Sequence, residues 1–455
     1  MLQALGAISD LEVDTSGPER ERARADKSGW KSAGEPLAVV YPRTVPAVQE
    51  CLRVAHREGV PVVPRGGGSG LSGGAIGGPG ELVISLEKLD AIVEISPEDR
   101  LARVQAGVLN SDLDHAAREH GLWFAPDPAS RQWSTIGGNI ATNAGGLLCA
   151  KYGVTRESVL ELSVVLVDGT LLRIGHRSVK GVTGFDLVGL FVGSEGLLGV
   201  IVEATVKLLP VSPHPPWTLA ARFGDISAAA SACQAITLGG ETPAVLELID
   251  AHCLRHIHRF HHMPPPESGE VLVIAQADGA DAPECVTRLA DICSQAGGQV
   301  EVSEDPETSE RLFSLRRSMH PAMEAVGHVL IEDVSVPRSQ MRAMFEQIRQ
   351  LEDKWNIEIP TVAHAGDGNL HPNFIVEQDS IPDTVWQAAD DLFRAAIALG
   401  GTLTGEHGVG LLKRRWLPDE LGADQLALQQ QIKTVFDPKG LLNPGKVFAD
   451  ATVDR

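Results

Sequence analysis

Three glycine-rich blocks in the N-terminal half constrain the fold of this chain more than any other feature. The first block follows the apolar pair Val62–Val63 and covers residues 64–73, PRGGGSGLSG. It contains the G-x-G-x-x-G pattern of dinucleotide-binding Rossmann folds, which requires a helix directly after the pattern. Here four more glycines and Pro79 follow within residues 74–80, and no helix tolerates that run. A Walker A loop is excluded as well, because Gly-Lys-Ser/Thr is missing.

The other two blocks cover residues 135–146 (TIGGNIATNAGG) and 193–199 (GSEGLLG). Successive glycine amides can form a nest around a diphosphate, because only glycine lets backbone N–H groups approach phosphate so closely. Arg65 adds a positive charge beside the first block. Three such blocks in one domain predict a long cofactor that passes several backbone segments.

A second feature is a histidine-flanked turn at residues 364–371, HAGDGNLH, followed later by GEHG at residues 405–408. Asp-Gly is a strong signal for a two-residue hairpin loop. Such a loop predicts that 366 pairs with 369, 365 with 370, and His364 with His371, with the histidine Cβ atoms about 5 Å apart. Two imidazoles and the carboxylate of Glu406 would form a His₂-carboxylate metal site with an open position. His407 is then a free base, and Asn373 shares the strand face of His371.

Composition limits the classes of protein that this chain can represent. Of its 455 residues, 43% are hydrophobic, and the formal net charge is −21. That charge argues against nucleic acid and anionic membrane surfaces as partners. No apolar run approaches the length of a transmembrane helix, and residues 1–22 lack the order of a signal peptide. The cysteines have no closely spaced pair, which excludes an iron–sulfur cluster from this chain and suggests reduced thiols in the cytoplasm; they are Cys51, Cys149, Cys233, Cys253, Cys285 and Cys293.

Short strands and helices alternate on both sides of a proline cluster at residues 210–216, which we interpret as a domain boundary. Before it, apolar positions at helical spacing predict a helix over Val45–Glu58. After it, glycine density falls and strands alternate with helices near residues 282–295, 307–326, 339–355 and 384–398. The pattern predicts a second α+β domain.

Together these motifs resemble the FAD-linked oxidases of the vanillyl-alcohol oxidase / p-cresol methylhydroxylase superfamily. Within it the chain is similar to the branch of D-lactate dehydrogenase, the glycolate oxidase flavoprotein subunit and D-2-hydroxyglutarate dehydrogenase. The resemblance rests on the three glycine blocks, the histidine turn, GEHG and NPGK at residues 443–446. It implies an α+β fold: a two-subdomain FAD-binding domain over residues 1–212, an α+β cap domain with an antiparallel sheet and the metal site over 213–420, and a C-terminal segment, 421–455, packing back on the FAD domain.

The resemblance implies non-covalent FAD, since Ser69 and Gly70 occupy the stretch where some superfamily members carry a flavin-linked histidine. Residues of the first block would hold the diphosphate, and the others would line the flavin and adenine. The implied FAD-binding residues are Arg65, Gly66, Gly67, Gly68, Ser69, Gly70, Pro126, Asp127, Thr135, Gly137, Gly138, Asn139, Thr142, Asn143, Gly145, Gly146, Glu195, Gly196, Gly199 and Asn443.

The same resemblance makes His364, His371 and Glu406 the ligands of one divalent metal (Zn²⁺, Mn²⁺ or Fe²⁺) and His407 the catalytic base. An arginine at the start of a cap helix would bind the substrate carboxylate; Arg316 fits, with Arg317 as the alternative, and Asn373 would also bind substrate. D-2-hydroxyglutarate enzymes carry a lysine shortly before their Asp-x-Ser strand, whereas this chain reads LIEDVS at residues 330–335. That difference favours a small monoacid.

We therefore expect an FAD-dependent dehydrogenase that oxidises D-lactate or glycolate to the 2-oxo acid. Its acceptor would be a quinone, a cytochrome, an electron-transfer flavoprotein or an iron–sulfur subunit. The protein would be cytoplasmic, or peripheral to the membrane through that acceptor. The alternatives are a D-2-hydroxyglutarate dehydrogenase, an FAD oxidase that uses O₂, and a non-enzymatic zinc-stabilised binding module. A histidine cluster including His258 and His262 is interpreted as part of a solvated lid, because no carboxylate or cysteine completes a site there.

Overall fold

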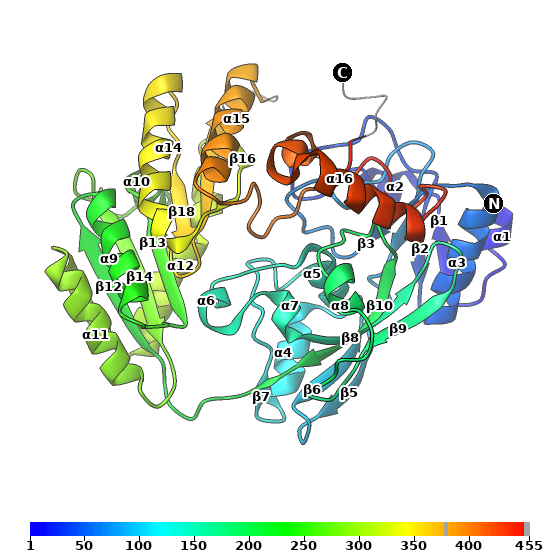
Figure 1. The fold of residues 1–455 in the computed structure, drawn as a ribbon, viewed down its shortest axis with the longest axis horizontal. Coiled ribbons are helices and arrows are strands. Elements are labelled where there is room, and N and C mark those ends of the chain that lie inside the picture. Colours follow the sequence, from blue (N-terminus) through cyan, green and yellow to red (C-terminus); the bar gives the residue numbers. More distant parts are fainter. Residues whose placement is uncertain (377–380, 450–455) are drawn as a thin grey trace. The chain divides into compact units, whose positions relative to one another are not determined.

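The structure, a computed structural model, describes residues 1–376 and 381–449, and residues 450–455 of the predicted C-terminal segment lie outside this range. The chain divides into two compact units (Figure 1). Unit 1 comprises Met1–Gly145, Val154–Val211 and Glu406–Arg455, and unit 2 comprises Gly146–Gly153 and Ser212–Gly405. Residues 406–420, assigned from sequence to the cap domain, thus lie in unit 1.

The first sheet of unit 1 has the strand order β1-β2-β4-β3, in which β2, β4 and β3 are parallel and β1 pairs antiparallel at the edge. The crossover between β2 and β3 is α3, which starts at the N-cap Thr44 and ends at Gly59 with φ 67°. The first glycine block follows β3 directly as a loop without a helix, as its sequence predicts. The elements are α1 (Leu2–Leu5), β1 (Leu11–Asp14), α2 (Gly17–Ala23), β2 (Ala38–Pro42), α3 (Val45–Glu58), β3 (Val62–Arg65) and β4 (Leu82–Ser85).

The second sheet of unit 1 is antiparallel, with the order β5-β6-β10-β8-β9. Its apolar face packs against α5, whose N-cap Thr135 begins the second glycine block. The elements are β5 (Ile92–Ser96), β6 (Leu101–Gln105), α4 (Asn110–Arg118), β7 (Leu122–Trp123), α5 (Ile136–Thr142), α7 (Thr155–Ser158), β8 (Val159–Val165), β9 (Leu171–Gly175), α8 (Leu187–Phe191), β10 (Val200–Lys207) and β11 (Leu209–Pro210).

The C-terminal segment of unit 1 returns to the first sheet. Two helices come before this segment: the 3₁₀ helix η2 (Arg414–Trp416) and α16 (Leu417–Phe436), which is broken at Gly422. The backbone N–H of Val62 then donates to the Leu441 carbonyl oxygen at 2.7 Å, and the N–H of Asn443 donates to the Val62 carbonyl oxygen at 2.7 Å. The segment thereby covers the free edge of β3.

Unit 2 is built on one antiparallel sheet with the order β15-β12-β14-β13-β18-β19-β16, and β17 also pairs with β19. Helices α10, α12 and α13 pack on the face that carries Val245 and Ile249. The elements are α6 (Cys149–Tyr152), β12 (Trp217–Phe223), α9 (Ile226–Leu238), β13 (Val245–Ile249), α10 (Ala251–Phe260), β14 (Val271–Ala277), α11 (Ala282–Gln295), β15 (Gln299–Ser303), α12 (Pro306–Arg317), α13 (Met319–Glu324), β16 (His328–Ile331), β17 (Val334–Ser335), η1 (Arg338–Gln340), α14 (Met341–Trp355), β18 (Thr361–His364), β19 (Asn369–Val376) and α15 (Asp383–Ala398).

Membrane-spanning helices were also sought in the described residues. None of the helices there is both long enough and apolar enough to cross a bilayer.

Candidate functional site

The histidine turn forms a hairpin, but its register differs from the predicted one. His364 lies opposite Asn369 and His371 lies opposite Val362, so the loop contains residues 365–368 rather than two residues. The N–H of Gly366 donates to the carbonyl oxygen of Leu246 on the neighbouring strand β13, at 3.2 Å. Within the turn, the N–H of Gly368 donates to the carbonyl oxygen of His364 at 3.0 Å. Because Gly366 pairs with β13 and not with Asn369, the loop is four residues long. The two imidazoles still meet, diagonally, with ring centroids 5.1 Å apart.

A buried carboxylate that the sequence analysis missed lies beside this hairpin. Glu247, on β13, has 0% of its surface exposed and accepts two hydrogen bonds. One comes from His364 Nδ1 at 2.6 Å and the other from Arg316 Nε at 2.6 Å. Burial alone would raise the pKa of Glu247, but His364 and Arg316 outweigh it and hold that pKa below its usual value.

Glu247 could have been found in the sequence. It interrupts the apolar strand Val245–Ile249 at a position that faces the same way as the two ends of that strand. A charged side chain in a strand buried on both faces requires a partner, and the signal is therefore a glutamate in an otherwise apolar run.

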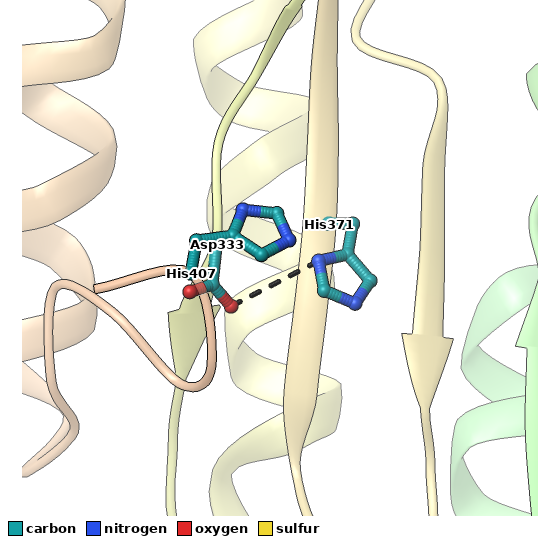
Figure 2. A group of neighbouring side chains, drawn as sticks. All are labelled: Asp333, His371 and His407. Atoms are coloured by element: carbon teal, nitrogen blue, oxygen red, sulfur yellow. Dashed lines mark ion pairs between the residues drawn. The ribbon is translucent and has the colours of Figure 1, made fainter. Parts of the chain in front are cut away.

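A second buried carboxylate lies beside the other histidine (Figure 2). Asp333 has 0% of its surface exposed, and one of its oxygens is 3.8 Å from His371 Nδ1. It also accepts hydrogen bonds from Asn369 Nδ2 at 2.6 Å and from Thr404 Oγ1 at 2.8 Å. The hydrogen bond between His364 Nδ1 and Glu247 is an arrangement typical of metal-binding histidines, whereas Asp333 faces His371 at ion-pair distance only.

In the part of the chain that the structure describes, two groups of three potential metal ligands have ligand atoms that all lie within 4.8 Å of one another. One group is His364, His371 and Glu406, the predicted metal ligands. The other is Asp333, His371 and His407, drawn in Figure 2. Glu406 and His407 directly follow Gly405, the last residue of unit 2. The donor set of two imidazoles and one carboxylate fits a divalent transition metal such as Zn²⁺, Mn²⁺ or Fe²⁺.

Arg316 lies in the last turn of α12, so the placement at the start of a helix was wrong. Its side chain is buried, whereas Arg317 is exposed and pairs with Glu310. Of the two alternatives, Arg316 bonds the buried Glu247 carboxylate, whereas Arg317 bonds the exposed Glu310. Asn373 is buried, and its amide nitrogen donates to the carbonyl oxygens of Pro360 and His371, at 3.0 and 2.8 Å.

Among the described residues, His258 and His262 belong to no group of potential metal ligands, and the expectation of a solvated lid is wrong for His258. His258 is buried, and its Nδ1 atom is 2.6 Å from the Pro264 carbonyl oxygen. His262 is exposed, with φ 52° at the end of the helix.

In unit 1 the three glycine blocks converge. A Cβ at Gly67 would collide with the Trp133 carbonyl oxygen just before the second block. The N–H groups of Gly193 and Glu195, in the third block, donate to the carbonyl oxygens of Ile140 and Ala141 at 2.9 and 2.8 Å. A Cβ at Gly196 would lie 3.2 Å from Pro64 Cγ. The blocks that lie apart in sequence therefore meet, backbone to backbone.

Several buried polar atoms in this region fit a polar ligand. The side-chain oxygens Asn139 Oδ1, Ser194 Oγ and Asn443 Oδ1 are buried and have no hydrogen-bond partner among the described residues. They come from the second block, the third block and the C-terminal segment. An unpaired buried acceptor is costly, so the hydrogen-bond donors of FAD, its ring N–H, its adenine amino group and its hydroxyls, suit these oxygens.

Glu195 and Asn443 tie these segments together. The Glu195 carboxylate accepts hydrogen bonds from the N–H groups of Val409 and Gly410, at 2.8 and 2.9 Å. Burial raises the pKa of this carboxyl, against the opposing effect of the two amides and Lys413. Asn443 Nδ2 donates to the carbonyl oxygens of Gly74 and Glu195, at 2.9 and 2.8 Å.

The remaining predicted FAD-binding residues are not all gathered in one unit. The Pro126 carbonyl oxygen accepts from Asn110 Nδ2 at 3.0 Å, and the Asn143 side chain accepts from the N–H of Arg156, in α7, at 2.9 Å. A Cβ at Gly145 would collide with Glu406. Gly146 belongs to unit 2, while Asp127, Thr142 and Gly199 lie in unit 1.

The sequence matches two family models over most of its length. Residues 36–175 match "FAD binding domain", and residues 213–447 match "FAD linked oxidases, C-terminal domain". The chain therefore belongs to the FAD-linked oxidases and is an FAD-linked oxidoreductase. This membership confirms the predicted superfamily, the predicted enzyme class and FAD as the cofactor.

Individual relatives cover nearly the whole chain. It is 39% identical to glycolate oxidase subunit GlcD of Bacillus subtilis, covering 97% of each chain. It is 34% identical to D-lactate dehydrogenase of Archaeoglobus fulgidus (91% of this chain, 92% of the relative) and 36% identical to D-2-hydroxyglutarate dehydrogenase of Xanthomonas citri (97% and 95%). A crystal structure of p-cresol methylhydroxylase superposes with a TM-score of 0.76 at 16% identity (97% and 95%), which confirms the predicted fold class.

Proposed function

We propose that this FAD-linked oxidoreductase is a dehydrogenase that oxidises a small D-2-hydroxy acid, D-lactate or glycolate, to the 2-oxo acid. Relatives that span the same length are named glycolate oxidase subunit and D-lactate dehydrogenase. Both substrates in those names are α-hydroxy monoacids. The proposal extends that chemistry to this chain.

The observation that carries the proposal is the meeting of Arg316 and His364 on Glu247. A guanidinium suits a substrate carboxylate through a bidentate pair, and a histidine suits a metal ion that polarises a hydroxyl. An α-hydroxy acid carries a carboxylate and a hydroxyl on adjacent carbons. Two protein groups that share one carboxylate can serve those two substrate groups together.

The residues of the chain then have separate tasks. His364, His371 and Glu406 would hold the divalent ion, and Arg316 would bind and orient the substrate carboxylate. His407 would take the hydroxyl proton, a role suited to a side chain that titrates near neutral pH. When bound, FAD would accept the hydride from the α-carbon, and the ion would lower the pKa of the hydroxyl.

The preference for a monoacid comes from strand β17 and the residues before it. Before Asp333-Val334-Ser335, where a D-2-hydroxyglutarate enzyme would carry a lysine, the chain reads Leu330-Ile331-Glu332 and has no lysine. This stretch therefore offers no cation for the distal carboxylate of a five-carbon diacid. D-2-hydroxyglutarate is nevertheless the second candidate, because a relative of that name is 36% identical over 97% of the chain.

We also propose that a separate acceptor reoxidises the flavin. The relative in Bacillus subtilis is named a subunit, which supports a partner protein as the acceptor. A dehydrogenase would be reoxidised slowly by air, whereas an oxidase would be reoxidised at the rate of turnover. Flavin reoxidation in air-saturated buffer separates these two classes.

The test is anaerobic flavin reduction, followed as loss of flavin absorbance, with D-lactate, L-lactate, glycolate and D-2-hydroxyglutarate. We expect D-lactate or glycolate to reduce the flavin with the highest kcat/KM. Reduction by D-2-hydroxyglutarate alone would replace the proposal with the second candidate, and no reduction by any acid of the panel would remove it.

A further inference from the structure

Three segments that lie far apart in sequence meet at the Glu247 carboxylate. Glu247 comes from the middle of β13, Arg316 from the last turn of α12 and His364 from the end of β18. All three lie in unit 2, and all three side chains are buried. Each carboxylate oxygen has its own partner, since Oε1 faces His364 and Oε2 faces Arg316, both at 2.6 Å.

The bond to His364 fixes which ring nitrogen is available. An ionised carboxylate can only accept, so the Nδ1 atom that faces Glu247 must carry the proton. The lone pair of the neutral ring is then on Nε2, the nitrogen that can bind a metal ion. Such a carboxylate also fixes the ring orientation and increases the basicity of the ligand nitrogen.

The hydrogen bond between Glu247 and Arg316 fixes the orientation of the guanidinium group. Glu247 binds the guanidinium through Nε only, a side-on contact that engages one edge of the group. The two terminal nitrogens form the end of the group and have the spacing of a carboxylate. A buried arginine without Glu247 would be an uncompensated charge, which is strongly unfavourable.

We propose that Glu247 is a positioning residue that sets His364 for the metal ion and Arg316 for the substrate carboxylate at the same time. This inference rests on the proposed function. It predicts that loss of one carboxylate weakens metal binding and substrate binding together, although neither ligand touches Glu247.

The test compares Glu247→Gln with a matched control, Asp250→Asn, in the full-length FAD-loaded protein. Asp250 is a buried carboxylate directly after the same strand, and it accepts from the backbone N–H groups of Cys253 and Thr361. The first readout is Zn²⁺ affinity without substrate, by competition with a chromophoric chelator. We expect Glu247→Gln to weaken Zn²⁺ binding by about 10–100-fold. Asp250→Asn should change the Zn²⁺ affinity by less than about twofold, because Asp250 accepts from backbone N–H groups.

The second readout is the KM for D-lactate at saturating Zn²⁺, measured in wild-type and Arg316→Ala backgrounds. Glu247→Gln should raise KM in the wild-type background and leave KM unchanged when Arg316 is already absent. If Glu247→Gln does not fold, Glu247→Asp replaces it. Aspartate keeps the charge but reaches only one of the two partners, so one readout should recover and the other should not.

The outcomes separate the inference from the proposed function. A wild-type protein that binds Zn²⁺ and is reduced by D-lactate, with a Glu247→Gln variant of unchanged Zn²⁺ affinity, overturns only the role of Glu247. A KM effect of the same size with and without Arg316 also overturns that role. A wild-type protein that neither binds Zn²⁺ nor is reduced by a 2-hydroxy acid removes both.

Discussion

The carboxylate of Glu195 accepts a hydrogen bond from the backbone N–H of Gly410 at 2.9 Å, so the third glycine block holds the segment that follows GEHG. The N–H of Val409 donates to the other oxygen at 2.8 Å. Gly408 has φ 84°, and a Cβ there would lie 3.1 Å from Glu195 Cδ. Any side chain at Gly408 would therefore disturb this contact.

Replacing Glu195 by alanine should leave two buried amides without an acceptor, at a cost of about 1–3 kcal/mol for each. Because Glu406 and His407 directly precede the tethered residues, flavin reduction by D-lactate should slow as well. Flavin fluorescence during heating and anaerobic stopped-flow reduction measure the two effects. Glu203→Gln on β10 is the control, since Glu203 accepts only from Ser163, at 3.4 Å. An unchanged melting temperature in Glu195→Ala would contradict the tether.

His407→Ala should keep FAD bound and lose the proton acceptor. Removing a general base typically slows the chemical step by about 10²–10⁴-fold. Stopped-flow reduction by D-lactate at pH 7.5 measures the rate, and flavin absorbance after gel filtration measures binding. The exposed His214→Ala is the matched control. Reduction of His407→Ala at the wild-type rate would exclude this residue from the mechanism.

Dialysis against a strong chelator should abolish turnover, because the group His364, His371 and Glu406 would lose its ion. Zn²⁺, Mn²⁺ and Fe²⁺ are then added back separately, and the ion that restores turnover identifies the functional metal. His371→Ala should not be rescued at the same metal concentration. Full activity in protein shown by elemental analysis to be metal-free would contradict a metal-assisted step.

The His252–Glu358 pair should make the stability of unit 2 depend on pH. The hydrogen bond to Glu358 raises the pKa of His252, and the same contacts, with His256 and Arg255, lower the pKa of Glu358. A raised histidine pKa stabilises the fold fully below the unfolded value of about 6.5, and this stabilisation is lost as pH rises through the folded value. Partial exposure limits it to a few tenths to about 1 kcal/mol.

Glu358→Gln should therefore lower the melting temperature more at pH 6 than at pH 9. Differential scanning fluorimetry across this range, with the exposed Glu301→Gln as control, measures the difference. A difference between wild type and Glu358→Gln that is equal at both pH values would show that His252 does not supply the charge.

Local patterns predicted much of the fold. The apolar stripe predicts the helix over Val45–Glu58 with the bounds that the structure has, because Thr44 and Gly59 supply both of its caps. The run of glycines after β3 correctly excludes a Rossmann helix. These features depend on residues that are close in sequence.

The sequence-based predictions were wrong or incomplete where contacts between segments far apart in sequence determine the structure. Asp367-Gly368 predicts a two-residue loop, but Gly366 bonds to Leu246 on the neighbouring strand, and the loop widens to residues 365–368. The apolar run around Glu247 signals a buried carboxylate, but its partners are known only once α12 and β18 bring Arg316 and His364 beside it. The prediction that His364 and His371 meet is nevertheless confirmed. In the observed register the two residues form a diagonal pair, and such a pair lies on one face of the hairpin.

The bridge between Val62 and the segment Leu441–Asn443 has a consequence for synthesis of the protein on the ribosome. Residues 212–405 of unit 2 emerge before residues 441–443, so the β3 edge of the nascent chain has no covering segment until those residues have been made. Uncovered strand edges can pair with other chains and aggregate. Truncation shortly before Leu441 should accordingly yield a polypeptide that depends on chaperones.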